Sequence, residues 1–296
     1  MAYTYFPGCC MHGFARHCQD SLYAVFNALG LELRELKDWS CCGATTYISV
    51  DEHQAFVLAA RNLAIAEQEN PEIVAPCTAC YMVLKKTQDY LGRYPDLRGK
   101  IERALATAGL KYRGTAKILH PLEILMRDVG VKALKAKVKR PLKGWNVAPY
   151  YGCLITRPYA LSGDMTLEDF DQVIPALGAN LVDFEMKTRC CGGSLPGTIE
   201  EVGHRLVYLL LHQAKRDRAD LLVTVCPLCQ LNLEAHQSKI KARYGETFDL
   251  PIPYFTQLIG VALGLSDEAL GLHKLLVPLK LEAIEKSFAV REPAAA

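Results

Sequence analysis

The sequence predicts an α/β protein made of two copies of one unit, each a small, mostly parallel sheet with flanking helices. Short apolar segments alternate with longer segments of helical periodicity, which is the pattern of βαβ units. The cysteine pattern of the first half of the chain also recurs in the second half. We therefore expect an N-terminal domain over 1–143 and a C-terminal domain over 144–296.

Each copy is expected to contribute four strands, recognised from short apolar or alternating segments. In the first copy the expected strands are Tyr3–Gly8, Glu32–Trp39, Ile73–Pro76 and Lys117–His120. In the second copy they are Val147–Tyr151, Asn180–Met186, Leu221–Val225 and Ile252–Phe255. Helical periodicity marks three segments between strands, namely Phe14–Leu29, Glu52–Glu69 and Ile199–Lys215.

Twelve cysteines in 296 residues are the most unusual feature of the composition. Four of them recur 149 positions later: Cys41, Cys42, Cys77 and Cys80 match Cys190, Cys191, Cys226 and Cys229. Cys9 recurs 144 positions later as Cys153, and the flanking sequences SCCGA and RCCGG also agree. Five matching positions indicate a C…CCG…CxxC unit that is used twice.

The overall composition is that of a soluble globular protein, with half of its residues apolar. Because 34 basic residues nearly balance 32 acidic ones, we expect no dominant nucleic-acid partner. The first ten residues lack the features of a signal peptide, and no apolar run reaches the roughly 18 residues of a membrane span. We expect a cytoplasmic protein, in which many cysteines indicate metal or redox chemistry rather than disulfides.

The basic stretch Lys132–Lys143 separates the two copies. It is interpreted as a solvated helix end and linker, because it lies where a domain boundary is expected. A docking patch for an acidic partner or substrate is the alternative.

The cysteines of each copy come directly after predicted strands. Cys9 follows the first strand, the Cys41–Cys42 pair follows the second, and the CxxC pair follows the third. Because ligands bind at the carboxyl edge of an open parallel sheet, each half would gather five thiols at such an edge.

Metal ligation explains five thiols per half better than the alternatives do. Buried structural cysteine accounts for one or two residues, a disulfide between neighbours is strained, and a thioredoxin-like CxxC leaves the CCG pair unexplained. Zinc and a cubane [4Fe–4S] cluster each take four thiolates and leave one over. Five thiols therefore suggest either an unusual cluster with a bridging thiolate or four ligands plus one reactive thiol, and we favour iron–sulfur over zinc.

Several other residues near the expected ligands are candidates for function. Cys10 is either an alternative ligand or, as we favour, an incidental loop thiol, whereas Cys18 is expected to be buried on a helix. His12 and His120 are candidate proton donors, and Arg157 is a candidate partner for a substrate anion. His12 and His17 both lie near the first ligand and are more typical of surface residues, although either could deliver a proton. His120 is equally interpreted as a satisfied core histidine.

The tandem pattern resembles the CCG-domain family, and within it the B subunits of heterodisulfide reductases. The segments YGCLITRP and PYFTQLIGVALGL add to this resemblance. In that family each CCG domain holds a noncubane [4Fe–4S] cluster on five cysteines. The resemblance therefore implies two such clusters, on Cys9, Cys41, Cys42, Cys77 and Cys80 and on Cys153, Cys190, Cys191, Cys226 and Cys229.

The resemblance also implies a catalytic subunit that cleaves or forms a disulfide, such as that of coenzyme M and coenzyme B, or acts on a related sulfur substrate. The expected partners are a ferredoxin-type subunit and a flavin subunit of the heterodisulfide reductase kind. The alternative is an electron-transfer subunit of a sulfur-oxidising, 2-hydroxyacid oxidase or fumarate reductase-type complex. Because the chain lacks both a classical ferredoxin run and a GxGxxG fingerprint, its electrons must pass to or from a separate partner.

The mechanism expected for the first alternative places one cluster on each side of a shared cleft. Two equivalent clusters would each deliver one electron to a disulfide that lies between the halves. We expect the floor of this cleft at the carboxyl edges of both sheets. If the halves face apart instead, the clusters would act as a serial electron relay.

Overall fold

The computed structural model describes residues 2–44, 46–159, 161, 165–279 and 281, and contains two parallel sheets. The first has the strand order β2-β1-β3-β4, and the second has the order β6-β5-β7. Their strands are β1 (Ala2–Tyr5), β2 (Glu32–Glu35), β3 (Glu72–Val74), β4 (Lys117–Leu119), β5 (Asn146–Tyr150), β6 (Asn180–Leu181) and β7 (Leu221–Thr224). All strand pairs are parallel, so the predicted α/β class is confirmed.

The two sheets share one topology, with β5, β6 and β7 in the places of β1, β2 and β3. The place of β4 is held in the second sheet by a single parallel bridge between Thr224 and Tyr254. The strand predicted at Ile252–Phe255 is therefore wrong. Pro251 and Pro253 accept hydrogen bonds from β7 but have no N–H to return, so the ladder cannot form fully.

Several predicted strands extend too far at their carboxyl ends. The first strand ends at Tyr5 rather than Gly8, the second at Glu35 rather than Trp39, and the sixth at Leu181 rather than Met186. At the first of these ends, Pro7 and Gly8 turn the chain out of the sheet, and Gly8 has a φ of +64°. The residues after each strand are therefore free to form the loops and helix starts that carry the cysteines.

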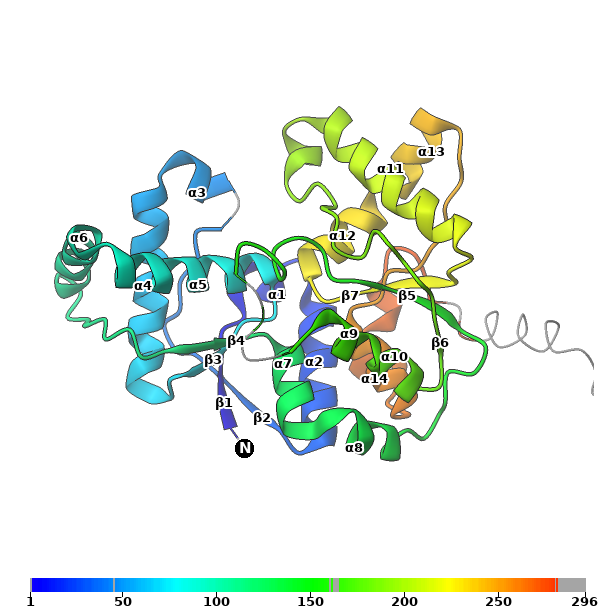
Figure 1. Cartoon of the computed structure of the whole chain (residues 1–296), viewed down its shortest axis with the longest axis horizontal. Coiled ribbons are helices and arrows are strands. Elements are labelled where there is room, and N and C mark those ends of the chain that lie inside the picture. The colour runs from blue at the N-terminus through cyan, green and yellow to red at the C-terminus, as the bar shows by residue number, and fades with distance from the viewer. Residues whose placement is uncertain (1, 45, 160, 162–164, 280, 282–296) are drawn as a thin grey trace, which may run out of the picture.

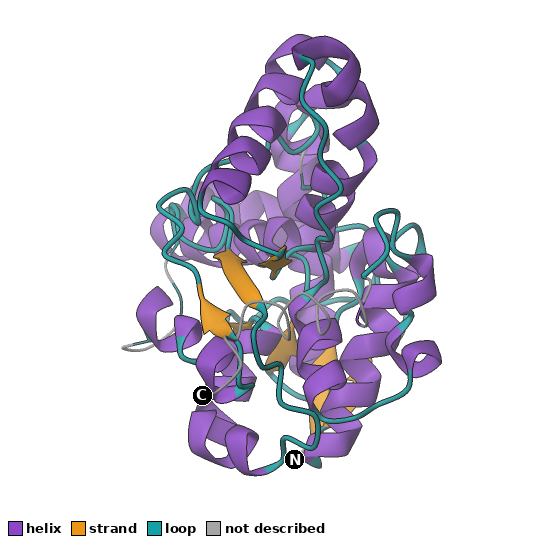
Figure 2. Cartoon of the chain, turned by 90° about the vertical axis from the view of Figure 1, so that its right-hand side faces the viewer, coloured by secondary structure: helices purple, strands orange, loops and turns teal. Residues whose placement is uncertain are grey.

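Helices surround the two sheets, whose strands lie in the interior (Figure 2). In the first half they are α1 (Gly8–His12), α2 (Arg16–Leu29), α3 (Thr46–Val50), α4 (Glu52–Glu69), α5 (Thr78–Arg93), α6 (Pro95–Ala106), α7 (Pro121–Ile124) and α8 (Gly130–Ala136), with a π-helical turn at Leu125–Val129. In the second half they are α9 (Leu167–Asp171), α10 (Val173–Ala176), α11 (Glu200–Arg216), α12 (Pro227–Ala235), α13 (Gln237–Tyr244), α14 (Phe255–Ala262) and α15 (Asp267–Leu270), with 3₁₀ turns at Leu195–Gly197 and Leu272–Lys274. Within the part of the chain described, none of these helices is both long and apolar enough to cross a bilayer.

The three helices predicted from periodicity are present, and their ends follow local chemistry. Asp51 caps α4 because its carboxylate accepts a hydrogen bond from the Gln54 N–H. Helix α2 ends at Leu29 and is capped by Gly30, whose φ of +79° is the left-handed conformation that glycine adopts at low cost.

The two halves pack into one body. Helices α14 and α15 of the second half lie against α2 of the first, near the centre of Figure 1. At this contact the hydroxyls of Ser21 and Thr256 are 2.7 Å apart and buried. The larger of two apolar clusters contains fully buried side chains from both halves, such as Tyr81 and Trp145.

The basic stretch between the copies is held against the second half. It comprises the end of α8 and a segment in which the Lys139 and Arg140 N–H groups both donate to the Ala262 carbonyl, each at 2.9 Å. The division at 143/144 stays a prediction, and residues 282–296 of the predicted C-terminal domain lie outside the described residues.

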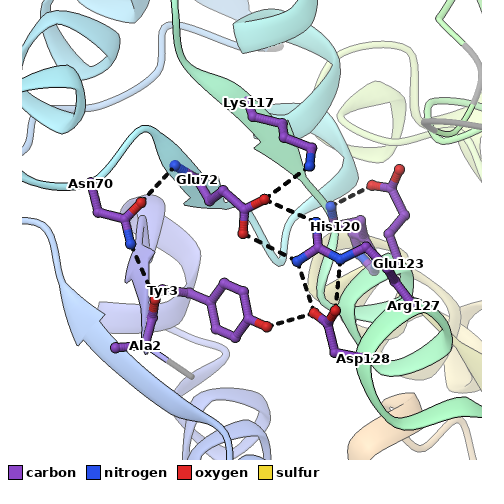
Figure 3. Close-up of polar contacts among 9 residues, drawn as sticks. All are labelled: Ala2, Tyr3, Asn70, Glu72, Lys117, His120, Glu123, Arg127 and Asp128. Atoms are coloured by element: carbon purple, nitrogen blue, oxygen red, sulfur yellow. Dashed lines mark hydrogen bonds and ion pairs between the residues drawn. The ribbon is translucent and has the colours of Figure 1, made fainter.

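A network of polar and charged side chains joins the amino ends of β1, β3 and β4 in the first sheet (Figure 3). Arg127 donates to both carboxylate oxygens of Glu72 at 3.0 and 3.1 Å and also pairs with Asp128. Asp128 accepts from the Tyr3 hydroxyl, and Lys117 pairs with Glu72. The network stabilises the edge of the sheet opposite to the cysteines.

We predict that Arg127→Met lowers the free energy of unfolding at neutral pH by about 1 kcal/mol, which for a chain of 296 residues is a fall in Tm of roughly 1–2 °C. The Arg127 hydrogen bonds, with help from Lys117, hold the pKa of Glu72 below its usual value. A lowered carboxyl pKa stabilises the fold above the unfolded-state pKa, and this stability is lost as the pH falls through the folded-state pKa.

The difference between wild type and Arg127→Met should therefore shrink once the pH drops below about 4, as measured by thermal denaturation across pH. Arg34→Met is the matched control, because the Arg34–Glu32 pair is largely exposed and should not change the Tm. A difference that persists unchanged in acid would contradict this electrostatic explanation.

Candidate functional site

The cysteines of each half gather where the strand order of its sheet reverses. In the first sheet, β1 carries the chain to β2 on one side and β3 lies on its other side, so the reversal falls between β1 and β3. Cys9 follows β1 and Cys77 follows β3, and in the second sheet Cys153 and Cys226 follow β5 and β7. This crevice outside the carboxyl ends is where open parallel sheets bind ligands.

Both CxxC motifs span the start of a helix. Cys77 is the N-cap residue of α5, and Cys226 is the N-cap residue of α12. Cys80 and Cys229 lie in the first turn of the same helices. The free N–H groups and the dipole at a helix N-terminus favour negative charge. Of the four CxxC cysteines, only Cys77 has a lowered pKa, through hydrogen bonds with Cys10 and other thiols, whereas neighbouring thiols raise the pKa of Cys80 and Cys229.

The glycine of each CCG motif is required by a close helix contact. Gly43 has a φ of +77°, and a Cβ there would lie 2.9 Å from the Ala55 Cα of α4. Gly192 has a φ of +96°, and a Cβ there would lie 3.3 Å from the Gly203 Cα of α11. In this conformation the Gly43 and Gly192 N–H groups donate to the sulfurs of Cys41 and Cys190, at 3.4 and 3.3 Å.

These N–H donors help to make the first cysteine of each CCG motif acidic. Hydrogen bonds from Cys42 and Cys9, followed by the Gly43 N–H, lower the pKa of Cys41 strongly. In the second half, the Cys153 hydrogen bond and the Gly192 N–H lower the pKa of Cys190 to about 6. Both halves therefore stabilise a thiolate at the same position.

The thiols of the first half form one contact chain. Cys9 lies in hydrogen-bonding contact with Cys10 and Cys41, and Cys42 Sγ is 3.1 Å from Cys80 Sγ. Cys10 contacts Cys9, Cys77 and Cys80. It is buried on α1 and is therefore not the loop thiol favoured from the sequence.

The thiols of the second half line a cavity of about 400 Å³. Cys153 contacts Cys190, Cys191 Sγ is 3.5 Å from Cys229 Sγ, and Cys226 contacts Cys229. The wall is completed by Leu154, Gly192, Gly193, Ser194, Leu195, Thr198 and Leu228, together with Ser49 and Thr78 from the first half.

The two thiol sets adjoin where the two halves meet. Cys77 and Cys226 lie in direct side-chain contact, and Thr78 also hydrogen-bonds Cys226. The cavity is therefore walled by both halves, but all of its thiols come from the second set. The cavity therefore differs from the expected cleft, which had both thiol sets in its floor. The first half contributes the hydroxyl-bearing residues Ser49 and Thr78 to the cavity wall, and no thiol.

His120 and Tyr254 hold the two CxxC turns together across the halves. His120 Nε2 lies 3.2 Å from the Pro76 carbonyl oxygen and 3.0 Å from that of Val225, while the Tyr254 hydroxyl donates to the Pro76 carbonyl at 3.0 Å. Pro76 and Val225 directly precede the two CxxC motifs. The two carbonyls next to the thiols are thus fixed by side chains that follow the fourth strand position of each half.

The protonation of His120 follows from these bonds. Its Nδ1 accepts from the Leu122 N–H, so Nε2 carries the proton and donates. Burial lowers the pKa of His120 to about 4, and the side chain has no exposed surface. The ring is therefore neutral at pH 7. Its hydrogen bonds favour a role in positioning the two CxxC turns, and the role of His120 as a proton donor stays a prediction.

Sequence reasoning missed Tyr254, although a signal was present. His120 and Glu123, three residues apart, form a capping box at the start of α7. Tyr254 and Gln257 form the matching capping box at the start of α14. Aligning the two copies on these boxes would have paired Tyr254 with His120.

The other predicted residues lie around the site. His12 is partly exposed and pairs with Glu35, at 3.1 Å. Arg157 is exposed and donates to the Thr188 carbonyl at 3.1 Å, and its charge contributes to the low pKa of Cys190. Cys18 is buried on α2, as expected, and donates to Gln230 Oε1 at 2.8 Å.

His17 is half-buried rather than a surface residue. Its Nε2 lies 2.8 Å from Gln230 Oε1, which also accepts from Cys18. His17 and Cys18 thus join α2 of the first half to α12 of the second.

The thiol sets fit the requirements of a polynuclear cluster. All twelve cysteines are free thiols, and glycine allows the backbone to approach the sulfurs closely: a Cβ on Gly8 would lie 2.9 Å from Cys80 Sγ, and one on Gly152 would lie 3.3 Å from Cys229 Sγ. Among the described residues, no three His, Cys, Asp or Glu side chains are arranged around a single metal ion. In the second half the thiols instead line the wall of a cavity.

Comparison with known families matches the cysteine-rich CCG domain twice, at residues 3–85 and 147–234. These ranges contain all ten cysteines that were matched between the copies. They exclude the fourth strand position and the helix that follows it in each half, where His120 and Tyr254 lie.

Curated relatives match almost the whole chain. The 8-methylmenaquinol:fumarate reductase membrane anchor subunit of Wolinella succinogenes is 33% identical over 94% of this chain and 98% of its own length. A protein of Archaeoglobus profundus, named as similar to the B subunit of heterodisulfide reductase, is 31% identical over 90% of this chain and 92% of its own length. The B subunit of the ferredoxin/F(420)H(2)-dependent CoB-CoM heterodisulfide reductase of Methanosarcina acetivorans is 28% identical over 91% of both chains.

One solved structure, a hypothetical protein from Helicobacter pylori, has a TM-score of 0.78 to this chain at 15% identity. The match covers 94% of this chain and 52% of that protein, so this chain spans about half of its length. The similarity shows the fold alone.

We predict that Gly8→Ala disturbs metal binding in the first half, because the added Cβ would lie 2.9 Å from Cys80 Sγ. Gly30→Ala is the matched control, since its φ is also positive but no described atom lies within 4 Å of the added Cβ. Both changes should cost about 1 kcal/mol or more through backbone strain. Anaerobic iron analysis should show a loss only in Gly8→Ala, and equal iron contents in the two variants would contradict the prediction.

Proposed function

The chain belongs to the cysteine-rich CCG-domain family, and on that basis we propose that it is the catalytic subunit of a heterodisulfide reductase-like complex. It would use two noncubane [4Fe–4S] clusters, one on each matched set of five cysteines, to cleave or form a disulfide. The observation that supports this most strongly is the direct contact of the two thiol sets at Cys77 and Cys226 beside a cavity walled by both halves.

Cleavage of a disulfide needs two electrons and two protons, and yields two thiols. When bound, iron–sulfur clusters supply electrons in single steps, and two sets held side by side suit a two-electron reaction. The chain's own contribution is to hold four cysteines at the starts of α5 and α12, and to stabilise thiolates at Cys41 and Cys190 with the help of the Gly43 and Gly192 N–H groups. His120 and Tyr254 keep the two CxxC turns in register.

The substrate would approach through the cavity of the second half. Hydroxyl groups of Ser49, Thr78 and Thr198 line it beside the thiols and can hydrogen-bond a sulfur or carbonyl group. Arg157 lies on the exposed side near Cys190, where it would attract an anionic part of the substrate. His12 is partly exposed and would exchange protons with solvent more readily than the buried His120.

The identity of the sulfur substrate is proposed at the level of class. The relatives named as parts of CoB-CoM heterodisulfide reductases support a disulfide formed from two thiol coenzymes as the substrate. A protein-bound sulfur compound is the alternative substrate. We propose a ferredoxin-type subunit and a flavin subunit as electron partners, and a cytoplasmic location.

A second candidate function is electron transfer within a fumarate reductase-type complex. The relative from Wolinella succinogenes, whose name states such a complex, supports it at 33% identity over nearly its whole length. In that case the two sets would pass electrons between partners without a disulfide substrate. Turnover by the isolated chain separates the two candidates.

We predict that the chain, purified without oxygen, contains about eight irons for two four-iron clusters and catalyses reduction of a disulfide by a low-potential dye. Cys41→Ala and Cys190→Ala should each lose about half of the iron, because their ligand sets are local to each half. Stoichiometric zinc would contradict the proposed clusters. Full iron without disulfide turnover would favour the electron-transfer candidate instead.

A further inference from the structure

We propose that Cys10 belongs to the ligand set of the first thiol centre, so that this half keeps its metal cluster without Cys9. The inference rests on the proposed iron–sulfur function and extends it to a residue outside the matched cysteines. The two centres then differ in their number of available cysteine ligands, which is six in the first half and five in the second.

The position of Cys10 carries the proposal. The residue is 5% exposed, and its side chain contacts the exposed Cys9 on one side and the CxxC pair of α5 on the other. It is in hydrogen-bonding contact with Cys9, Cys77 and Cys80, all three of which are expected ligands. Cys9 itself is in such contact with Cys10 and Cys41.

The backbone around Cys10 holds this thiol in place. Its carbonyl accepts hydrogen bonds from the Ala15 N–H at 2.9 Å and from the Gly13 N–H at 3.2 Å. These bonds close the short α1 helix onto the start of α2, so the Cys10 side chain points inward while Cys9 faces solvent.

The second half provides an internal comparison. Cys153 matches Cys9, because each follows a glycine of positive φ whose added Cβ would meet the second CxxC sulfur. The next residue is then Leu154 in place of Cys10, and Leu154 lines the cavity with the five thiols. The residue after the first cysteine therefore faces the thiol space in both halves, but only the first half has a thiol there.

Matched variants of the full chain test this assignment through the iron content. With about eight irons in the wild type, Cys9→Ala should retain about eight, whereas Cys153→Ala should fall to about four because Leu154 cannot bind iron. The double variant Cys9→Ala with Cys10→Leu should fall to about four, and Cys10→Leu alone should retain about eight because Cys9 remains. Leucine is chosen because it occupies the matching position at 154.

A gain-of-ligand variant completes the test. Leu154→Cys in the Cys153→Ala background should restore the iron lost by Cys153→Ala, with an absorption spectrum like that of the wild type. Far-ultraviolet circular dichroism monitors folding, and Cys9 is an exposed position at which alanine should not disturb the fold.

The iron measurements distinguish a failure of this inference from a failure of the proposed function. Iron-loaded wild type together with a loss of about four irons in Cys9→Ala would overturn the role of Cys10 and leave the clusters in place. Retention of all iron by the Cys9→Ala, Cys10→Leu double variant would overturn it as well. A wild-type chain without iron would overturn the proposed function, and the inference with it.

Discussion

The hydrogen bonds that cross between the halves at the CxxC turns are the interaction on which the site depends. Pro76 and Val225 present their carbonyls immediately before the two turns, and His120 and Tyr254 bind them from the ends of the fourth strand positions. Without this clamp each sheet would still gather its own cysteines, because the strand order reverses at the same place in both. With it, Cys77 and Cys226 come into contact, and two separate thiol sets become one composite site.

Much of this arrangement could be predicted from the sequence, because it follows from local pattern. Local sequence pattern is enough to show that five cysteines recur, that they follow strands and that the sheets are parallel. Glycines such as Gly43 also mark turns that need a positive φ. The strand expected at Ile252–Phe255 failed because the prolines that border it remove ladder donors. The Tyr254 bond to Pro76 joins residues 178 apart in sequence, and periodicity carries no information about such contacts.

The two copies have diverged around a shared framework. In the first half Cys9 and Cys41 are exposed, whereas in the second half Cys153 and Cys190 are partly covered and line the cavity. The clamp residues also differ, since a neutral histidine binds two carbonyls and a tyrosine binds one. The cavity thus opens on one thiol set, and the buried extra thiol Cys10 lies in the other.

The most direct test of the composite site is an anomalous difference map, measured at the iron absorption edge from crystals grown without oxygen. Two separate groups of iron, one among the thiols that follow β1, β2 and β3 and one among those that follow β5, β6 and β7, with Cys77 and Cys226 between them, would agree with the account. A single group shared by both halves, or anomalous signal from zinc in place of iron, would contradict it.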